Sequence, residues 1–266
     1  MGKEIYIQKF NTVSKYRKSV EIKDSNMPII VVSAIHTADK SSASNEDRNR
    51  WLAEEEVWCN QVSSSNAITY ELINCDTKGD DTLTSKTCNV NVSSFGCIDS
   101  SRPGIFNKTI LSLKKNFDDP KGYTHFVRTN TSTYILNNRL LKIMKSIDFT
   151  TPVYTGVAEF THGLHGGWGI ILTREAVKLI LDNVNRDDFT NSETEDDILI
   201  PEVLTRGSDN VIRPRDDFGY SWVWEKSVMY NMDRIMFDPN IVFIRLKNRP
   251  NTQTYLNVVS FLSMFR

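Results

Sequence analysis

Consecutive acidic residues at the start of a predicted helix are the first candidates for catalysis. Thr194, Glu195, Asp196 and Asp197 stand directly before an apolar helical segment. One of the carboxylates could act as a general base towards a hydroxyl group. Alternatively, the acids complement the helix dipole, with Thr194 as the N-cap. Three adjacent like charges exceed what capping needs, which favours a functional site.

A polar segment after the third predicted strand is the second candidate. It consists of Arg128, Thr129, Asn130, Thr131 and Ser132. An arginine there could bind a phosphate in a bidentate manner, and the neutral side chains offer oxygen ligands or hydrogen-bond donors. The same composition is also typical of a polar turn that carries a surface arginine. The segment therefore has a binding and a structural interpretation.

A glycine-rich segment, Thr161–Gly169, is the third candidate. His162 and His165 could hydrogen-bond sugar hydroxyls, and the ring of Trp168 could stack on a sugar face. The glycines permit close approach of the backbone. A tight hairpin is the alternative. A zinc site is weakly supported, because no third ligand stands at a recognised spacing from the two histidines.

Basic residues follow the last predicted strand and precede another helix. Arg245, Lys247 and Arg249 place three cations within five residues, a pattern that suits a diphosphate. An exposed basic turn is the alternative. Arg102 and Lys108 lie near the start of a helix, where an anion is favoured by the free backbone N–H groups.

The pattern of apolar residues predicts elements that would position these groups. We expect strands over 27–35, 67–75, 122–129, 151–160, 168–173 and 241–246 and helices over 45–62, 104–117, 137–147, 174–184 and 195–206. Residues 76–103 are predicted to form one long loop. Alternation of buried strands and helices predicts an α/β domain with helices on both faces of the sheet. Such open sheets bind ligands beyond the carboxyl ends of their strands.

Composition excludes several classes of protein. The 266 residues contain 32 Lys and Arg against 33 Asp and Glu, a net charge of −1, so a general nucleic-acid binder is not expected. No apolar run is long enough to predict a transmembrane segment. The first residues lack an apolar stretch typical of a secretory signal, so we expect a cytoplasmic protein. Four cysteines without a CxxC pair are interpreted as reduced thiols, with one bridge left open.

The order of the motifs resembles GT-A glycosyltransferases of the fringe and β-1,3-galactosyltransferase type. HFVRTNTSTYI (125–135) is similar to the "FRTNLSSF" signature of small bacterial and large-virus sugar transferases. FIRLKNR (243–249) is similar to their basic C-terminal motif, and a D-D-I helix start follows a glycine-rich turn. The resemblance covers about residues 27–265.

This resemblance implies a GT-A (Rossmann-like) open mixed sheet in a single domain, 27–266, after an N-terminal extension, 1–26. Its nucleotide-binding part would span about 27–135, and its acceptor and catalytic part about 136–266. It further implies a nucleotide-sugar donor, most often a UDP-sugar, a glycan acceptor and inversion at the anomeric carbon. Asp197 falls where the related enzymes carry the catalytic base, with Asp196 beside it. The oligomeric state stays open.

The remaining site residues follow from the same resemblance and from their places after strands. The donor-binding residues that we expect are Ser33, Ala34, His36, Lys108, Arg128, Thr129, Asn130, Ser132, Arg245 and Lys247. The acceptor-binding residues that we expect are His162, His165, Gly166, Gly167 and Trp168.

One departure from the family concerns the metal. GT-A enzymes usually carry D-x-D, whose carboxylates hold Mg²⁺ or Mn²⁺, where this chain has Asn130, Thr131 and Ser132. Neutral oxygens alone bind a hard divalent cation poorly. Either Mn²⁺ or Mg²⁺ is held weakly with help from water and the diphosphate, or basic side chains neutralise the leaving group. The missing motif also keeps open a non-catalytic module that binds nucleotide-sugars or glycans.

Overall fold

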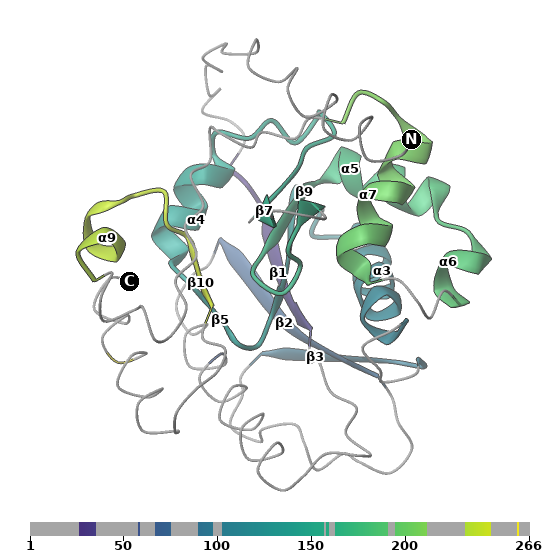
Figure 1. Cartoon of the computed structure of the whole chain (residues 1–266), viewed down its shortest axis with the longest axis horizontal. Helices are drawn as coiled ribbons and strands as arrows, with labels where there is room; N and C mark the ends of the chain where they lie inside the picture. Colours follow the sequence, from purple (N-terminus) through teal and green to yellow (C-terminus); the bar gives the residue numbers. More distant parts are fainter. Residues whose placement is uncertain are drawn as a thin grey trace, which may run out of the picture.

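The computed structural model of the chain describes residues 27–35, 58, 67–75, 90–97, 103–156, 158–159, 163–190, 195–211, 232–245 and 260. A six-stranded sheet forms its centre, in the order β3-β2-β1-β4-β9-β6 (Figure 1). The strands are β3 (Asn91–Phe95), β2 (Ile68–Cys75), β1 (Ile30–Ile35), β4 (His125–Asn130), β9 (Ile170–Thr173) and β6 (Tyr154–Gly156). The first four are mutually parallel, and β9 runs antiparallel to both β4 and β6. The predicted open mixed sheet is confirmed.

Helices cover both faces of this sheet (Figure 1). The helices α3 (Gly104–Phe117), α5 (Arg174–Asn183) and α7 (Asp196–Gly207) share one apolar cluster, and α4 (Asn137–Met144) belongs to the other. Because side chains alternate along a strand, β1 serves both clusters. Val31 packs with the first cluster, and Ile30 and Val32 pack with the second.

Two short strand pairs and two short helices complete the described part of the chain. β5 (Thr133–Ile135) pairs antiparallel with β10 (Phe243–Arg245), and β7 (Ala158–Glu159) pairs with β8 (Gly163–Leu164). The short helices are α6 (Arg186–Thr190) and α9 (Met232–Phe237). Arg139 of α4 donates to the carbonyl oxygens of Ile235, Asp238 and Ile241, so it fastens the end of α9 and the chain that enters β10.

Two sequence predictions need correction. The single loop predicted over 76–103 is wrong at β3, which pairs with β2 at the edge of the sheet although it is rich in Asn and Ser. The strand predicted over 151–160 is divided into β6 and β7. Cys97 is disulfide-bonded, which agrees with the one bridge that the sequence prediction left open.

Other predictions fall partly outside the described residues. The extension 1–26 lies outside them, as does the predicted helix over 45–62 apart from the helical, buried Trp58. Within the described residues, no helix is both long and apolar enough to cross a membrane.

The first residue of β4 gives the fold a predicted sensitivity to acid. His125 is buried, with its Nε2 3.3 Å from the carbonyl oxygen of Ile147, and burial lowers its pKa to about 4. As the pH falls from 6.5 to 4, the unfolded chain binds this proton before the folded chain does, so stability is lost over that window. The loss is about 3 kcal/mol at about 1.4 kcal/mol per pKa unit.

We expect His125→Gln to flatten the pH dependence of the free energy of unfolding between about pH 7.5 and about pH 4.5, because glutamine binds no proton in this range. Urea unfolding of both proteins at the two pH values measures this. An unchanged slope in the variant would assign the acid sensitivity to other groups.

Candidate active site

An ion pair between the sheet and α7 lies at the centre of the site. Arg128 Nη2 is 2.8 Å from Asp196 Oδ2, and both side chains are almost fully buried. The hydroxyl of Thr109 on α3 donates to the same carboxylate oxygen at 3.2 Å. The residue at the N-cap of α7, Glu195, makes no side-chain capping bond. Asp196 therefore connects α7 to β4 and α3, beyond any effect on its own helix dipole.

The direction of Arg128 follows from its position on β4. Phe126, two residues earlier, packs in the cluster of α3, α5 and α7, and side chains two residues apart share one face of a strand. Arg128 Nη1 donates to Asn130 Oδ1 at 3.0 Å. Its buried Nε has no hydrogen-bond partner among the described residues. Two predicted donor-binding residues thus bind each other, and one of them also binds Asp196.

Asp197 is held from the opposite side by the glycine-rich segment. The backbone N–H of Gly166 donates to Asp197 Oδ1 at 2.6 Å, and His165 Nδ1 lies 3.5 Å from Oδ2. Burial raises the pKa of Asp197 to about 8, and the Asp196 carboxylate contributes to this rise. Arg128 and the Gly166 N–H oppose it. Asp197 is therefore largely protonated at neutral pH and ionises at a pH of about 8.

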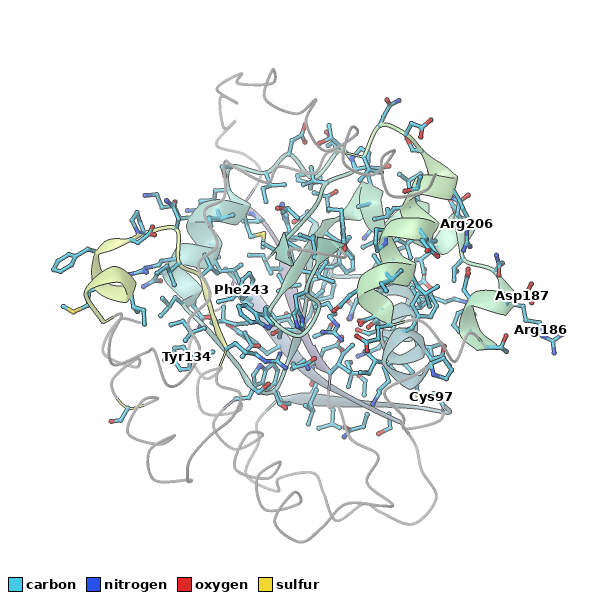
Figure 2. All side chains as sticks on the ribbon, in the orientation of Figure 1. Cys97, Tyr134, Arg186, Asp187, Arg206 and Phe243 are labelled. Carbon is cyan, nitrogen blue, oxygen red and sulfur yellow. The ribbon has the colours of Figure 1, made fainter. Side chains whose placement is uncertain are left out.

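The turn 165–169, between β8 and β9, needs its glycines for close packing. A Cβ at Gly166 would collide with Asp197 Oδ1 and lie 2.9 Å from Arg128 Nη1. A Cβ at Gly167 would lie 2.5 Å from Arg245 Nη1. Gly169 has a φ of 152° and packs on the ring of Phe243, a residue of β10 that is labelled in Figure 2. A Cβ at Gly166 or Gly167 would force these side chains to shift, and the φ of Gly169 is one that favours glycine.

Arg245 on β10 holds the same turn from the other side. Its Nη1 donates to the carbonyl oxygen of Gly167 and lies 3.4 Å from Thr133 Oγ1. The Thr133 hydroxyl also donates to that carbonyl at 2.7 Å. Arg245 is buried. The structure therefore places this predicted diphosphate ligand against the backbone of the turn.

Several other predicted residues have little or no exposed surface. Ser33 donates to Glu71 Oε1 at 2.6 Å and accepts from Ser112 at 2.9 Å. Ala34 and Lys108 are fully buried. These placements give no support to a contact between their side chains and a nucleotide.

Some of the remaining predicted donor- and acceptor-binding residues are buried, and others lie outside the described residues. Thr129, Ser132 and Trp168 are buried, and the Trp168 ring lies 5.5 Å from that of His165. The His165 side chain keeps an exposed fraction of 32%. His36, His162 and Lys247 lie outside the described residues.

Sequence analysis does not predict two buried residues that bond to predicted site residues, Glu71 and Thr109. Glu71 accepts from Ser33, Ser112, Asn116 and Lys115, and a lone acid inside the apolar strand ITYELINC could have indicated it. Thr109 gave no comparable signal, because its bond to Asp196 joins residues 87 positions apart.

Comparison with solved structures finds sugar transferases. A glycosyltransferase involved in glycosylation of the major capsid of PBCV-1 aligns over 89% of this chain and 100% of its own, at 11% identity and a TM-score of 0.45. The galactosyltransferase LgtC, in complex with donor and acceptor sugar analogues, aligns over 87% and 95%, at 7% identity and a TM-score of 0.44. A protein from Desulfovibrio desulfuricans G20, described as a putative nucleotide-diphospho-sugar transferase, aligns over 90% and 97%, at 13% identity and a TM-score of 0.44.

Neither a protein-family model nor a curated protein sequence matches the chain. Because the structural similarities have TM-scores below about 0.5, the function has to be inferred from the residues of the site.

The high pKa of Asp197 has a measurable consequence for stability. Its folded-state pKa lies above that of the unfolded chain, so stability falls as the pH rises from about 4 to about 8 and then stays level. An asparagine side chain cannot ionise, so we expect Asp197→Asn to melt at a higher temperature than the wild type at about pH 9, with a smaller difference at about pH 5.

Thermal melts at both pH values test this expectation. Asp182→Asn, on α5, serves as the matched control and is expected to show no such pH dependence. A variant at position 197 that is less stable than the wild type at the higher pH would contradict the proposed cost of ionisation.

Proposed function

We propose that the chain is a GT-A-type inverting glycosyltransferase that moves a sugar from a nucleotide-diphosphate sugar, a UDP-sugar in the first instance, to a glycan hydroxyl. The observation that carries the proposal is the environment of Asp197. This carboxyl group is nearly buried, is fixed by the Gly166 N–H, and has a pKa raised to about 8. A base is most effective when its pKa lies near the working pH.

In the proposed reaction, ionised Asp197 removes the proton of the acceptor hydroxyl. The hydroxyl oxygen forms a bond to the anomeric carbon while the bond from that carbon to the diphosphate oxygen breaks. The electron pair of the broken bond leaves with the nucleotide diphosphate, and the proton stays on Asp197. The anomeric carbon passes through an oxocarbenium-like state, as in glycoside hydrolysis.

The neighbours of Asp197 support distinct positions for the two substrates. His165 is partly exposed and lies beside Asp197 Oδ2, so we assign it to the acceptor hydroxyl. Arg128 and Asn130 lie at the carboxyl end of β4, where open α/β sheets bind their ligands, so we assign that end to the donor. Arg128 supplies positive charge there, which favours departure of an anionic leaving group.

A non-catalytic module that binds nucleotide-sugars is the second candidate. It is favoured by one observation, namely that Asn130, Thr131 and Ser132 carry no carboxylate where GT-A enzymes usually have D-x-D. Such a module would bind a donor without turning it over.

A substitution at the proposed base tests the function. Thermal shift with UDP-, GDP- and dTDP-sugars identifies a donor, because a bound ligand raises the melting temperature. We then expect Asp197→Asn to lower the transfer or donor-hydrolysis rate about 10²–10⁴-fold, the usual contribution of a general base, with donor binding retained. The wild-type rate should rise with pH towards about 8, as Asp197 ionises.

Asp187→Asn, at an exposed position of α6, is the matched control and should keep the wild-type rate. Transfer that persists in Asp197→Asn would remove this residue as the base. Donor binding by the wild type without turnover of any acceptor or of water would favour the binding module.

A further inference from the structure

The family resemblance implies a divalent cation, and the structure allows its fit to be tested. Asn130, Thr131 and Ser132 stand where the family carries D-x-D, and Asn130 is neutral. Arg128, two residues before Asn130, bonds to Asn130 and is paired with the carboxylate of Asp196. Across the described ranges, no group of three or more His, Cys, Asp or Glu side chains could hold a metal ion. A hard cation such as Mg²⁺ or Mn²⁺ at this segment would meet the amide oxygen of Asn130 and the carboxylate of Asp196.

The guanidinium group of Arg128 already lies between those side chains. Its Nη1 donates to Asn130 Oδ1 at 3.0 Å, and its Nη2 pairs with Asp196 Oδ2 at 2.8 Å. The same Asp196 oxygen also accepts from Thr109. These two oxygens, which could serve as ligands of a divalent cation, are therefore bonded to one cation of the chain itself.

Packing around the guanidinium leaves little space for a second cation. A Cβ placed at Gly166 would lie 2.9 Å from Nη1 and 3.0 Å from Cζ, so the turn 165–169 covers this group directly. Arg128 keeps only 3% of its side-chain surface exposed. A divalent ion at the same oxygens would meet an arginine charge at close range in a site shielded from water, where repulsion is strong.

We propose that Arg128, paired with Asp196 and Asn130, takes the place of the divalent cation, so that transfer needs neither Mn²⁺ nor Mg²⁺. The catalytic half of this proposal rests on the proposed function. The binding half, that these residues hold no divalent ion while Arg128 is present, does not depend on any turnover.

Manganese binding tests the second half without a substrate. Titration of the wild type with Mn²⁺, followed by electron paramagnetic resonance, should show no site up to about 1 mM, the weak end of protein sites for divalent cations. In Arg128→Met, the oxygens of Asn130 and Asp196 are released, and we expect a Mn²⁺ site to appear. Adding Asp196→Asn to that variant should remove it.

Arg206→Met is the matched control. It breaks another ion pair of α7, more exposed than that of Arg128, in which Arg206 Nη1 is 2.7 Å from Asp188 Oδ2 at the far end of the helix (Figure 2). About ten residues of helix separate Arg206 from Asp196, a distance of about 15 Å. No Mn²⁺ site should appear in this variant.

Activity tests the first half. The wild-type rate should be the same in EDTA as with Mn²⁺, and Arg128→Met should lose at least about tenfold in rate and regain part of it with Mn²⁺, which a merely structural loss would not show.

A wild-type Mn²⁺ site that Asp196→Asn abolishes would overturn the proposal, even if Arg128→Met does not fold. A folded Arg128→Met that binds no Mn²⁺ would also overturn it. Failure of every donor to react would count against the proposed function, while the Mn²⁺ titrations would still decide the binding half.

Discussion

The buried ion pair between Arg128 and Asp196 fixes the rest of the site. Removing either partner would leave an uncompensated charge in the interior, which is strongly destabilising. The pair therefore ties the first turn of α7 to the end of β4. Asp197 is the next residue, and once Asp196 is held its carboxyl group is directed to the turn that enters β9. One electrostatic constraint thus determines where the proposed base lies and which backbone group it meets.

This arrangement places function and stability in opposition. Asp197 is buried beside a second carboxylate, and both conditions oppose its ionisation. A well-solvated aspartate would cost the fold less, but it would be a weak base with an ordinary pKa. Proteins commonly accept a less stable arrangement at the position that carries their chemistry. The opposing effects of Arg128 and of the Gly166 N–H keep the pKa at about 8, within reach of ordinary working conditions.

Sequence patterns predicted the elements better than the bonds between them. A continuous apolar run indicates β1, and periodicity indicates α3 and α5, because these patterns record burial directly. The strand β3 was missed because an edge strand buries few side chains. The sequence predicts Asp197, Gly166 and Arg245 as site residues from three separate segments, and each segment also has a structural interpretation. Their contacts join distant parts of the chain, and a single sequence holds no record of such pairings.

The glycine-rich turn shows why both of its sequence interpretations were incomplete. The sequence predicts that it binds an acceptor or forms a simple hairpin, and in the structure its glycines also lie against two buried arginines. The Arg128 guanidinium packs against Gly166, and Arg245 donates to the carbonyl of Gly167. A side chain at Gly166 would meet the Arg128 guanidinium and Asp197 Oδ1, and one at Gly167 would meet the Arg245 guanidinium. The proposed base therefore depends on both cations through the backbone of the turn, a role that neither arginine would have if it only contacted the diphosphate.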